Sequence, residues 1–179
     1  ALYMIAHAVQ QNDSRHIRTL AELNAVTYGD NMIADLNAGI NITDTLEQLL
    51  ISTDGRIDKF DIIADRMMAD YVRSIQVAPG GIVTDIYPAE GNEAGKIDLI
   101  HDKYRGETVK YSIANDALII HGPFELEQGG HVLSIRNPVF LQDEKGTPYF
   151  WGMTMVIIKV PDIFQHSADA LTNFDYQYR

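Results

Sequence analysis

The stretch ALIIHGPFELEQGGHVLSIRNPVFLQDEKGTPYFWGMTMVIIKV, residues 117–160, decides the fold class. It contains three runs rich in β-branched and aromatic residues, which is the composition of β-strands. The short segments EQGG and QDEKG that separate these runs have the composition of tight turns. Consecutive strands joined by short turns pair antiparallel, so this stretch predicts three antiparallel strands. We expect them at 117–126, 132–141 and 148–160.

Two further short β-branched runs lie upstream, at 72–77 and 82–87, and the turn sequence APGG separates them. A short helix is expected between the two groups of strands, at about 106–115. Strands grouped in this way, with helices before and between them, predict an α+β fold. We therefore expect a five-stranded antiparallel PAS-like sheet with flanking helices.

The first third of the chain has a helical pattern. From Ile5 to Leu36 apolar residues recur mostly at steps of three or four, and the first proline is Pro79. This predicts a long helix of about 35 residues, about 52 Å in length, that stops at Gly39. The alternative is two helices that break near Gly29.

Three more helices are expected further along the chain. A capping-box pattern at Asp44 predicts the start of one that ends at the turn sequence STDG. Apolar spacing predicts the next at about 59–71, and Pro161 suits the first turn of a last short helix.

Composition excludes several classes of function. The 179 residues include 14 Lys and Arg against 25 Asp and Glu, a net charge of −11, which opposes binding to nucleic acid or to an anionic membrane surface. With no cysteine there is no disulfide, thiolate zinc site or cysteine nucleophile. The six histidines have no metal-ligand spacing, and no acid, base and nucleophile assemble in a known pattern. We expect no cofactor and no enzyme activity; a small soluble enzyme is the least supported hypothesis.

Several motifs occur in an order that resembles one family. They are QVAPGGIV at 76–83, YPAEGNE at 87–93, GPFEL at 122–126, RNPVF at 136–140 and Trp151-Gly152. Together they resemble the CHASE domain, an extracytoplasmic sensor of membrane receptors. The resemblance implies a long N-terminal helix before a PAS-like sheet. It also implies a parent protein that reports to a cytoplasmic histidine kinase or GGDEF diguanylate cyclase domain.

The resemblance also implies an organisation of the chain. Residues 1–58 are expected to be a helical stalk and dimerisation region, 59–165 the sensor domain, and 166–179 an exit segment toward the membrane. The chain is interpreted as an ectodomain between two membrane-spanning helices. Its expected partners are a small-molecule ligand and a second copy of itself, paired through the N-terminal helix. The alternative is a ligand-free structural or dimerisation spacer between membrane helices.

Three ligand positions follow from the resemblance to plant cytokinin-sensing members, and they align with Asp98, Arg136 and Glu127. Those members have a small hydroxyl residue where this chain has Arg136 and a leucine-like contact near Glu127, so cytokinin recognition is not inherited. Asp98 can accept a bond from an amino group, and Arg136 offers a planar fork to a carboxylate or phosphate. The two suit an anionic or zwitterionic ligand. The alternatives are an internal Asp98–Arg136 ion pair or an arginine that points to solvent.

Alternation along the strand at 132–141 sets which side chains share a face. Val132, Ser134 and Arg136 are predicted on one face and Leu133, Ile135 and Asn137 on the other. Aromatic walls of the same pocket are predicted from Phe124, Tyr111 and Trp151, with His121 beside them. The alternative for each is an ordinary core position.

Overall fold

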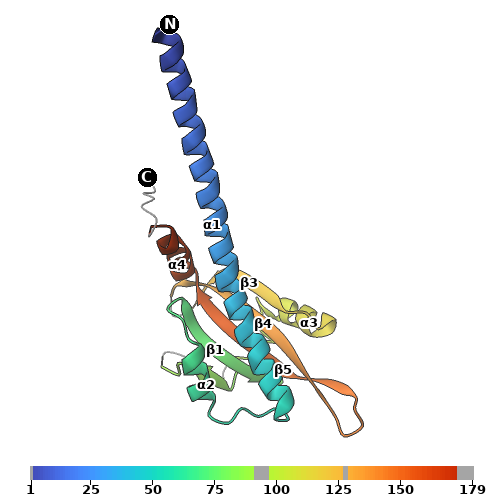
Figure 1. Ribbon diagram of the computed structural model, residues 1–179. Helices are drawn as coiled ribbons and strands as arrows, with labels where there is room; N and C mark the ends of the chain where they lie inside the picture. Colours follow the sequence, from blue (N-terminus) through green and yellow to red (C-terminus); the bar gives the residue numbers. More distant parts are fainter. Residues whose placement is uncertain (1, 91–96, 127–128, 173–179) are drawn as a thin grey trace. The chain divides into compact units, whose positions relative to one another are not determined.

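The computed structural model describes residues 2–90, 97–126 and 129–172. By internal contacts the chain forms two compact units, Leu36–Ile163 in one and Ala1–Asp35 with Phe164–Arg179 in the other. The first of these contains the whole β-sheet, which is drawn as a single layer of arrows in Figure 1. The candidate site lies within this unit.

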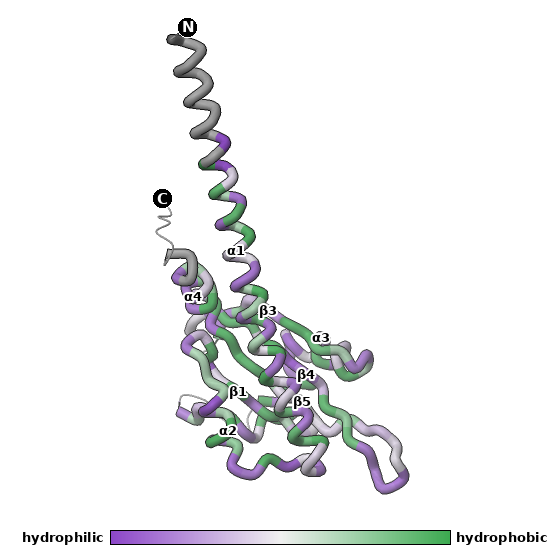
Figure 2. Tube along the Cα trace, viewed as in Figure 1, coloured by the Kyte–Doolittle hydropathy of each residue, from purple (hydrophilic) through white to green (hydrophobic). Residues whose placement is uncertain are grey.

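The sheet has five antiparallel strands in the order β2-β1-β5-β4-β3. The α+β class and the five-stranded antiparallel PAS-like sheet are therefore confirmed. The hairpin turn between β4 and β5 is hydrophilic and is purple in Figure 2, as its QDEKG sequence indicates. The strand bounds are β1 Val72–Pro79, β2 Asp85–Tyr87, β3 Ile119–Glu125, β4 His131–Gln142 and β5 Pro148–Lys159.

The helices differ from the prediction mainly at the N-terminal end. The chain has α1 Leu2–Ser52, α2 Phe60–Met67, α3 Gly106–Asn115 and α4 Val160–Thr172. The predicted stop at Gly39 and the predicted new start at Asp44 are both wrong, because α1 continues through them to Ser52. An interior glycine costs a helix about 1 kcal/mol, which tertiary packing can offset. The predicted bounds of α3 are confirmed.

Gly39 has a packing reason to be glycine. A Cβ built at this position would lie 2.6 Å from Cδ1 of Ile135 and 3.2 Å from Cδ1 of Ile158, both fully buried on the sheet. The glycine therefore allows α1 to approach β4 and β5 closely. From the sequence alone, a glycine needed for close packing cannot be distinguished from a glycine that ends a helix.

Residues 36–52 of α1 cover one face of the sheet. Leu46 and Leu50 are buried there together with side chains from β1, β4 and β5. Two polar contacts join the same surfaces: Thr154 Oγ1 donates to the Thr43 carbonyl at 3.0 Å, and Asn137 Nδ2 donates to Glu47 Oε2 at 2.8 Å. Burial raises the pKa of Glu47, while the bond from Asn137 opposes that change.

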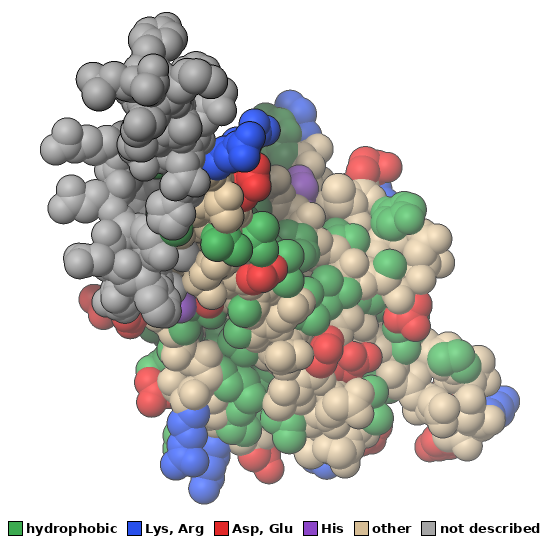
Figure 3. Space-filling view, turned by 45° about the horizontal axis from the view of Figure 1, so that its top comes forward, with side chains coloured by type: hydrophobic (Ala, Val, Ile, Leu, Met, Phe, Trp, Pro, Cys, Tyr) green, Lys and Arg blue, Asp and Glu red, His purple; other side chains and the backbone are tan. Residues whose placement is uncertain are grey.

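A second, smaller apolar cluster lies under α3. It joins Val109 of α3 and Leu99 of the preceding segment to Met153 and Met155 of β5. On the surface, acidic side chains are dispersed over the face shown in Figure 3, which accommodates the net charge of −11 without one concentrated patch on that face.

The other unit contains the N-terminal part of α1 and most of α4. Asp35 accepts a hydrogen bond from Ser167 Oγ at 3.2 Å, and His166 Nδ1 lies 2.8 Å from the same carboxylate oxygen. Four apolar side chains of α1 are largely exposed: Ile17, Leu23, Val26 and Ile33. Within the described part of the chain, no helix combines the length and apolarity that a membrane span needs.

A matched pair of glycine variants in α1 tests the close approach to the sheet. We expect Gly39→Ala to lower the free energy of unfolding by about 1 kcal/mol, because overpacking costs about 1–3 kcal/mol and helix propensity returns at most about 1 kcal/mol. Gly29→Ala meets no atom within 4 Å and should cause no loss. Urea unfolding of both variants measures the difference. A Gly39→Ala variant at least as stable as the wild type would contradict the packing argument.

Candidate functional site

A cavity of about 670 Å³ lies against the face of the sheet opposite α1. Strands β1, β4 and β5 form its floor, and the segment 97–105 with the end of β3 forms its walls. The lining residues are Arg73, Ser74, Gln76, Ile97, Asp98, Leu99, His101, Asp102, Arg105, Phe124, Glu125, Leu126, Ser134, Arg136, Met155 and Ile157.

Strand register builds the cavity floor from two rows of cross-strand neighbours. One row runs Ser74, Ile157, Ser134 and the other runs Gln76, Met155, Arg136. Because alternate side chains of a strand point to opposite faces, the residues between them face α1. The predicted alternation is confirmed at Ser134 and Arg136 on the cavity side, and at Ile135 and Asn137 on the α1 side.

Asp98 shapes the first part of the wall. Its Oδ1 accepts from the backbone N–H groups of Ile100 and His101, both at 3.1 Å, and its Oδ2 lies 2.8 Å from His101 Nδ1. The contact with the His101 ring, followed by the His101 backbone N–H, lowers the pKa of Asp98. Its lowered pKa keeps Asp98 ionised, and its side chain is 43% exposed, so it lies at the solvent-exposed edge of the site.

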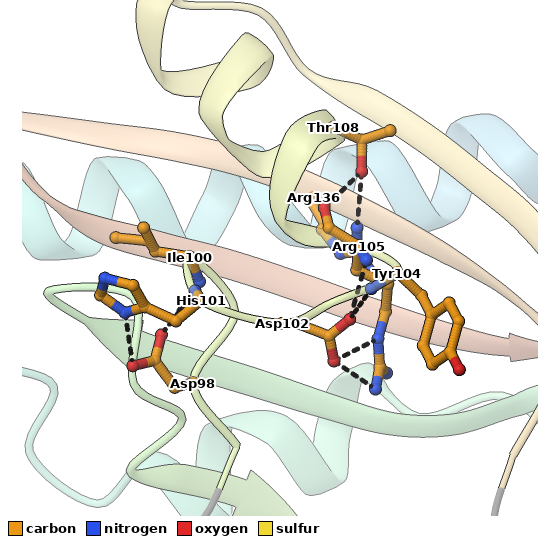
Figure 4. A network of polar contacts seen from close by, with 8 residues as sticks. All are labelled: Asp98, Ile100, His101, Asp102, Tyr104, Arg105, Thr108 and Arg136. Atoms are coloured by element: carbon orange, nitrogen blue, oxygen red, sulfur yellow. Dashed lines mark hydrogen bonds and ion pairs between the residues drawn. The ribbon is translucent and has the colours of Figure 1, made fainter.

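Asp102 and Arg105, in the segment before α3, form an ion pair with two hydrogen bonds between their side chains. Asp102 Oδ1 accepts from the N–H groups of Tyr104 at 2.8 Å and Arg105 at 2.7 Å. Its Oδ2 accepts from Arg105 Nε at 3.0 Å and Nη2 at 2.8 Å. Burial opposes ionisation of Asp102, but the bonds from the Arg105 side chain and backbone outweigh it and hold its pKa below the usual range. The pair therefore fixes the wall where α3 begins (Figure 4).

Arg136 is a buried charged group of the cavity that has few bonds. It is 1% exposed, and its Nη1 makes one long contact, 3.5 Å, with Thr108 Oγ1 (Figure 4). Its Nε has no hydrogen-bond partner among the described residues, and neither has the buried Ser134 Oγ. Burial and then the charge of Arg105 lower the pKa of Arg136 to about 10, although Asp102 opposes this. A buried guanidinium so weakly bonded is costly to the fold.

Three of the predicted ligand residues line the cavity: Asp98, Arg136 and Phe124. The alternatives for Arg136 do not hold, because it is buried rather than solvent-facing and Asp98 pairs with His101 instead. Glu127 lies outside the described residues.

Tyr111 and Trp151, expected as aromatic walls, do not line the cavity. Tyr111 is 61% exposed because α3 buries the face of Val109 and Ser112. Trp151 packs with the core on the α1 side and against Gly55. The register of β4 and β5 shifts between Val139 and Phe140, and this bulge adds Trp151 to β5 as an extra residue, which changes the face it points to.

The sequence interpretation missed Asp102 and Arg105 as parts of the site, and it placed Ser134 on the face of Arg136 without naming it as a ligand residue. An Asp four residues before the start of a helix, followed by an Arg, was the available signal for the Asp102–Arg105 pair. His121 pairs with Ser134 across the strands and its ring lies 5.4 Å from that of Phe124. Burial, then the charges of Arg136 and Arg105, lower the pKa of His121, so its ring is neutral at pH 7.

The polar groups of the cavity suit binding rather than metal coordination. Within residues 2–90, 97–126 and 129–172, no group of three His, Asp or Glu side chains could hold a metal ion. The unused donors at Arg136 and Ser134 are the groups that a bound molecule could satisfy.

The comparisons with known proteins support the fold. No known protein family matches the sequence, and no curated protein matches it either. Among solved structures, the chain is similar to an extracellular ligand binding receptor from Desulfohalobium retbaense DSM5692, with a TM-score of 0.60 and 16% identity over 79% of this chain. It is also similar to the ligand-binding domain of Campylobacter jejuni chemoreceptor Tlp3 in complex with 4-methylisoleucine, with a TM-score of 0.48 and 12% identity over 79% of this chain.

This chain spans only part of the proteins it resembles. The match covers 26% of the Desulfohalobium receptor and 57% of the chemoreceptor domain. At 16% identity the likeness to the Desulfohalobium receptor shows a shared fold alone.

The weak bonding of Arg136 predicts an unusual effect on stability. We expect Arg136→Met to raise the free energy of unfolding of the unliganded chain by about 1–3 kcal/mol. The fall of the Arg136 pKa from 12.5 to about 10 means that the folded protein disfavours the charged guanidinium by about 3 kcal/mol, and methionine removes that cost. Arg105→Met is the matched control and should lower stability by about 1 kcal/mol, because it leaves the partly buried Asp102 without its guanidinium. Denaturant unfolding measures both. A destabilised Arg136→Met variant would mean that Arg136 is a structural residue.

Proposed function

We propose that this chain is the extracytoplasmic ligand-sensing domain of a transmembrane signalling receptor of the CHASE type. Its ligand is a small molecule held in the cavity between the sheet and the segment 97–105. In this proposal the parent protein is anchored in the membrane and ends in a histidine kinase or GGDEF diguanylate cyclase domain. Residues 1–58 serve as a helical stalk and dimerisation region, 59–165 as the sensor and 166–179 as the exit segment. The domain itself catalyses no reaction.

The observation that best supports this proposal is the cavity with Arg136 in its floor. A volume of about 670 Å³ falls within the range of about 300–1,000 Å³ that small-molecule sites occupy. A protein keeps a buried, weakly bonded guanidinium at a cost to stability. A ligand that supplies a hydrogen-bond acceptor for Arg136 would explain why the chain retains this arginine. The shared fold with an extracellular ligand-binding receptor supports the same proposal.

The sheet offers a short route from this cavity to α1. Arg136 faces the cavity, and the next residue of β4, Asn137, faces α1 and bonds Glu47. Thr154, the cross-strand partner of Asn137, bonds the Thr43 carbonyl of the same helix. A ligand that moves β4 at Arg136 therefore alters contacts one residue away on the helix. Couplings of this kind are commonly worth about 1–3 kcal/mol.

The receptor is proposed to act as a homodimer through α1. The exposed apolar side chains Ile17, Leu23, Val26 and Ile33 support this, because a second copy could cover them. We expect sedimentation velocity to show a dimer for the chain and a monomer for Val26→Glu, because a carboxylate at the interface opposes its burial. Arg18→Glu, at a position that is already charged and exposed, is the control. A chain that is monomeric at high concentration would refute the dimer.

The alternative is a ligand-free structural or dimerisation spacer, and a ligand screen separates the two. A ligand at 100 times its dissociation constant should raise the free energy of unfolding by about 2.7 kcal/mol. We expect a thermal-shift screen of amino acids, organic acids and nucleobases to find such a ligand, and hydrogen exchange at residues 43–47 to slow when it binds. No stabilisation by any compound would favour the spacer.

A further inference from the structure

We infer that the ligand of this cavity is a small organic acid with one carboxylate group, and that this carboxylate binds the guanidinium of Arg136. The inference rests on the proposed function and names its ligand class. It starts from the two unused donors of the cavity floor, Arg136 Nε and Ser134 Oγ, which are buried and have no acceptor among the described residues. They lie two residues apart on β4, on the same face.

The acceptor sites of Asp98 and Asp102, in contrast, are mostly occupied. An ionised carboxylate has about four acceptor sites. All four of Asp102 are used, by the N–H groups of Tyr104 and Arg105 and by two nitrogens of the Arg105 side chain. Asp98 uses three, toward the N–H groups of Ile100 and His101 and the His101 ring. The floor therefore offers buried free donors to a ligand, while the two carboxylates of the segment 97–105 have little capacity left for a ligand, which favours an anion over an amine.

Charge at the cavity floor points the same way. The formal charges of the lining residues balance, since Arg73, Arg105 and Arg136 face Asp98, Asp102 and Glu125. The balance is not local, because Asp102 is bound to Arg105, the half-exposed Asp98 is bound to His101, and Glu125 is exposed at the end of β3. Arg136 is the buried charge without a bonded counter-ion among the described residues. One carboxylate would neutralise it, and a planar carboxylate matches the guanidinium fork.

The rest of the ligand is expected to be apolar. Near Arg136 and Ser134 the floor contains Met155 and Ile157, their cross-strand neighbours, and the wall contains Phe124 and Leu126. These four side chains can bury a hydrocarbon or aromatic body, while the cavity volume of about 670 Å³ exceeds what a bare carboxylate needs. A small monocarboxylic acid with an apolar chain or ring fits both parts of the site.

Matched probes test the ligand class on the 179-residue chain. We expect isothermal titration calorimetry to show that phenylacetate or 4-methylpentanoate binds. Phenylacetate should bind at least about tenfold tighter than phenylacetamide, because a hydrogen bond to a charged group is worth about 1.5–3 kcal/mol and the neutral amide cannot form an ion pair with Arg136. L-leucine differs from 4-methylpentanoate only by its ammonium group and should bind no tighter. Benzylamine should not bind.

Variants then locate the contact. Arg136→Met should weaken carboxylate binding roughly 10- to 150-fold, and Arg136→Lys should weaken it less, since it keeps the charge but loses the fork. Arg66→Met removes one positive charge from α2, outside the lining of the cavity, and should change affinity less than about threefold, because Arg66 is exposed and screened. Arg136→Met is expected to fold, so its unfolding midpoint confirms that lost binding is not lost structure.

The outcomes separate this inference from the proposed function. Phenylacetamide or benzylamine binding as tightly as the acids, or carboxylate binding that Arg136→Met leaves unchanged, would overturn the carboxylate site and leave a ligand sensor. L-leucine binding more than tenfold tighter than 4-methylpentanoate would replace the monocarboxylate by a zwitterion. Failure of every probe class, together with failure of the broader screen, would overturn both the inference and the sensor.

Discussion

The antiparallel pairing of β4 with β5 is the constraint on which the rest of this structure depends. The two strands pair from Val132 to Gln142, and most of their side chains are buried on both faces. One face packs against residues 36–52 of α1, and the other forms the cavity floor and packs under α3. Because the side-chain period is two, a one-residue slip would exchange Arg136 for Asn137 and place a charge against the apolar surface of α1. The register therefore holds the core and the site together.

The charged side chains of the cavity differ in how completely they are hydrogen-bonded. Asp102 and Arg105 satisfy each other where α3 begins, and Asp98 is satisfied by its own segment and His101. Arg136 is left with one long contact to Thr108. The Asp102–Arg105 pair and the bonds of Asp98 stabilise the wall in the absence of ligand. The weakly bonded Arg136 lowers the stability of the unliganded fold. A site whose wall carboxylates are bonded internally, and whose floor contains an unsatisfied guanidinium, is suited to recognise a group that complements this guanidinium.

Several expectations from sequence failed for identifiable reasons. Gly39 has the signature of a helix stop, yet α1 passes through it, because the missing Cβ serves the contact with Ile135. Trp151 shares the strand parity of Met153 and Met155, yet the bulge opposite Val139 and Phe140 changes its face. In both cases a contact with residues distant in sequence overrode the local pattern.

By itself the sequence determined the period of each segment and hence the secondary structure, because turn residues and alternation are local properties of the chain. The five strands, α3 and the two faces of β4 follow from it. It also singled out Asp98 and Arg136. Only the tertiary structure decided that these two side chains do not pair with each other, since Asp98 reaches His101 within its own segment and Arg136 lies in a floor assembled from three strands. Burial and bonding are set by residues far apart in the chain, and no local pattern specifies them.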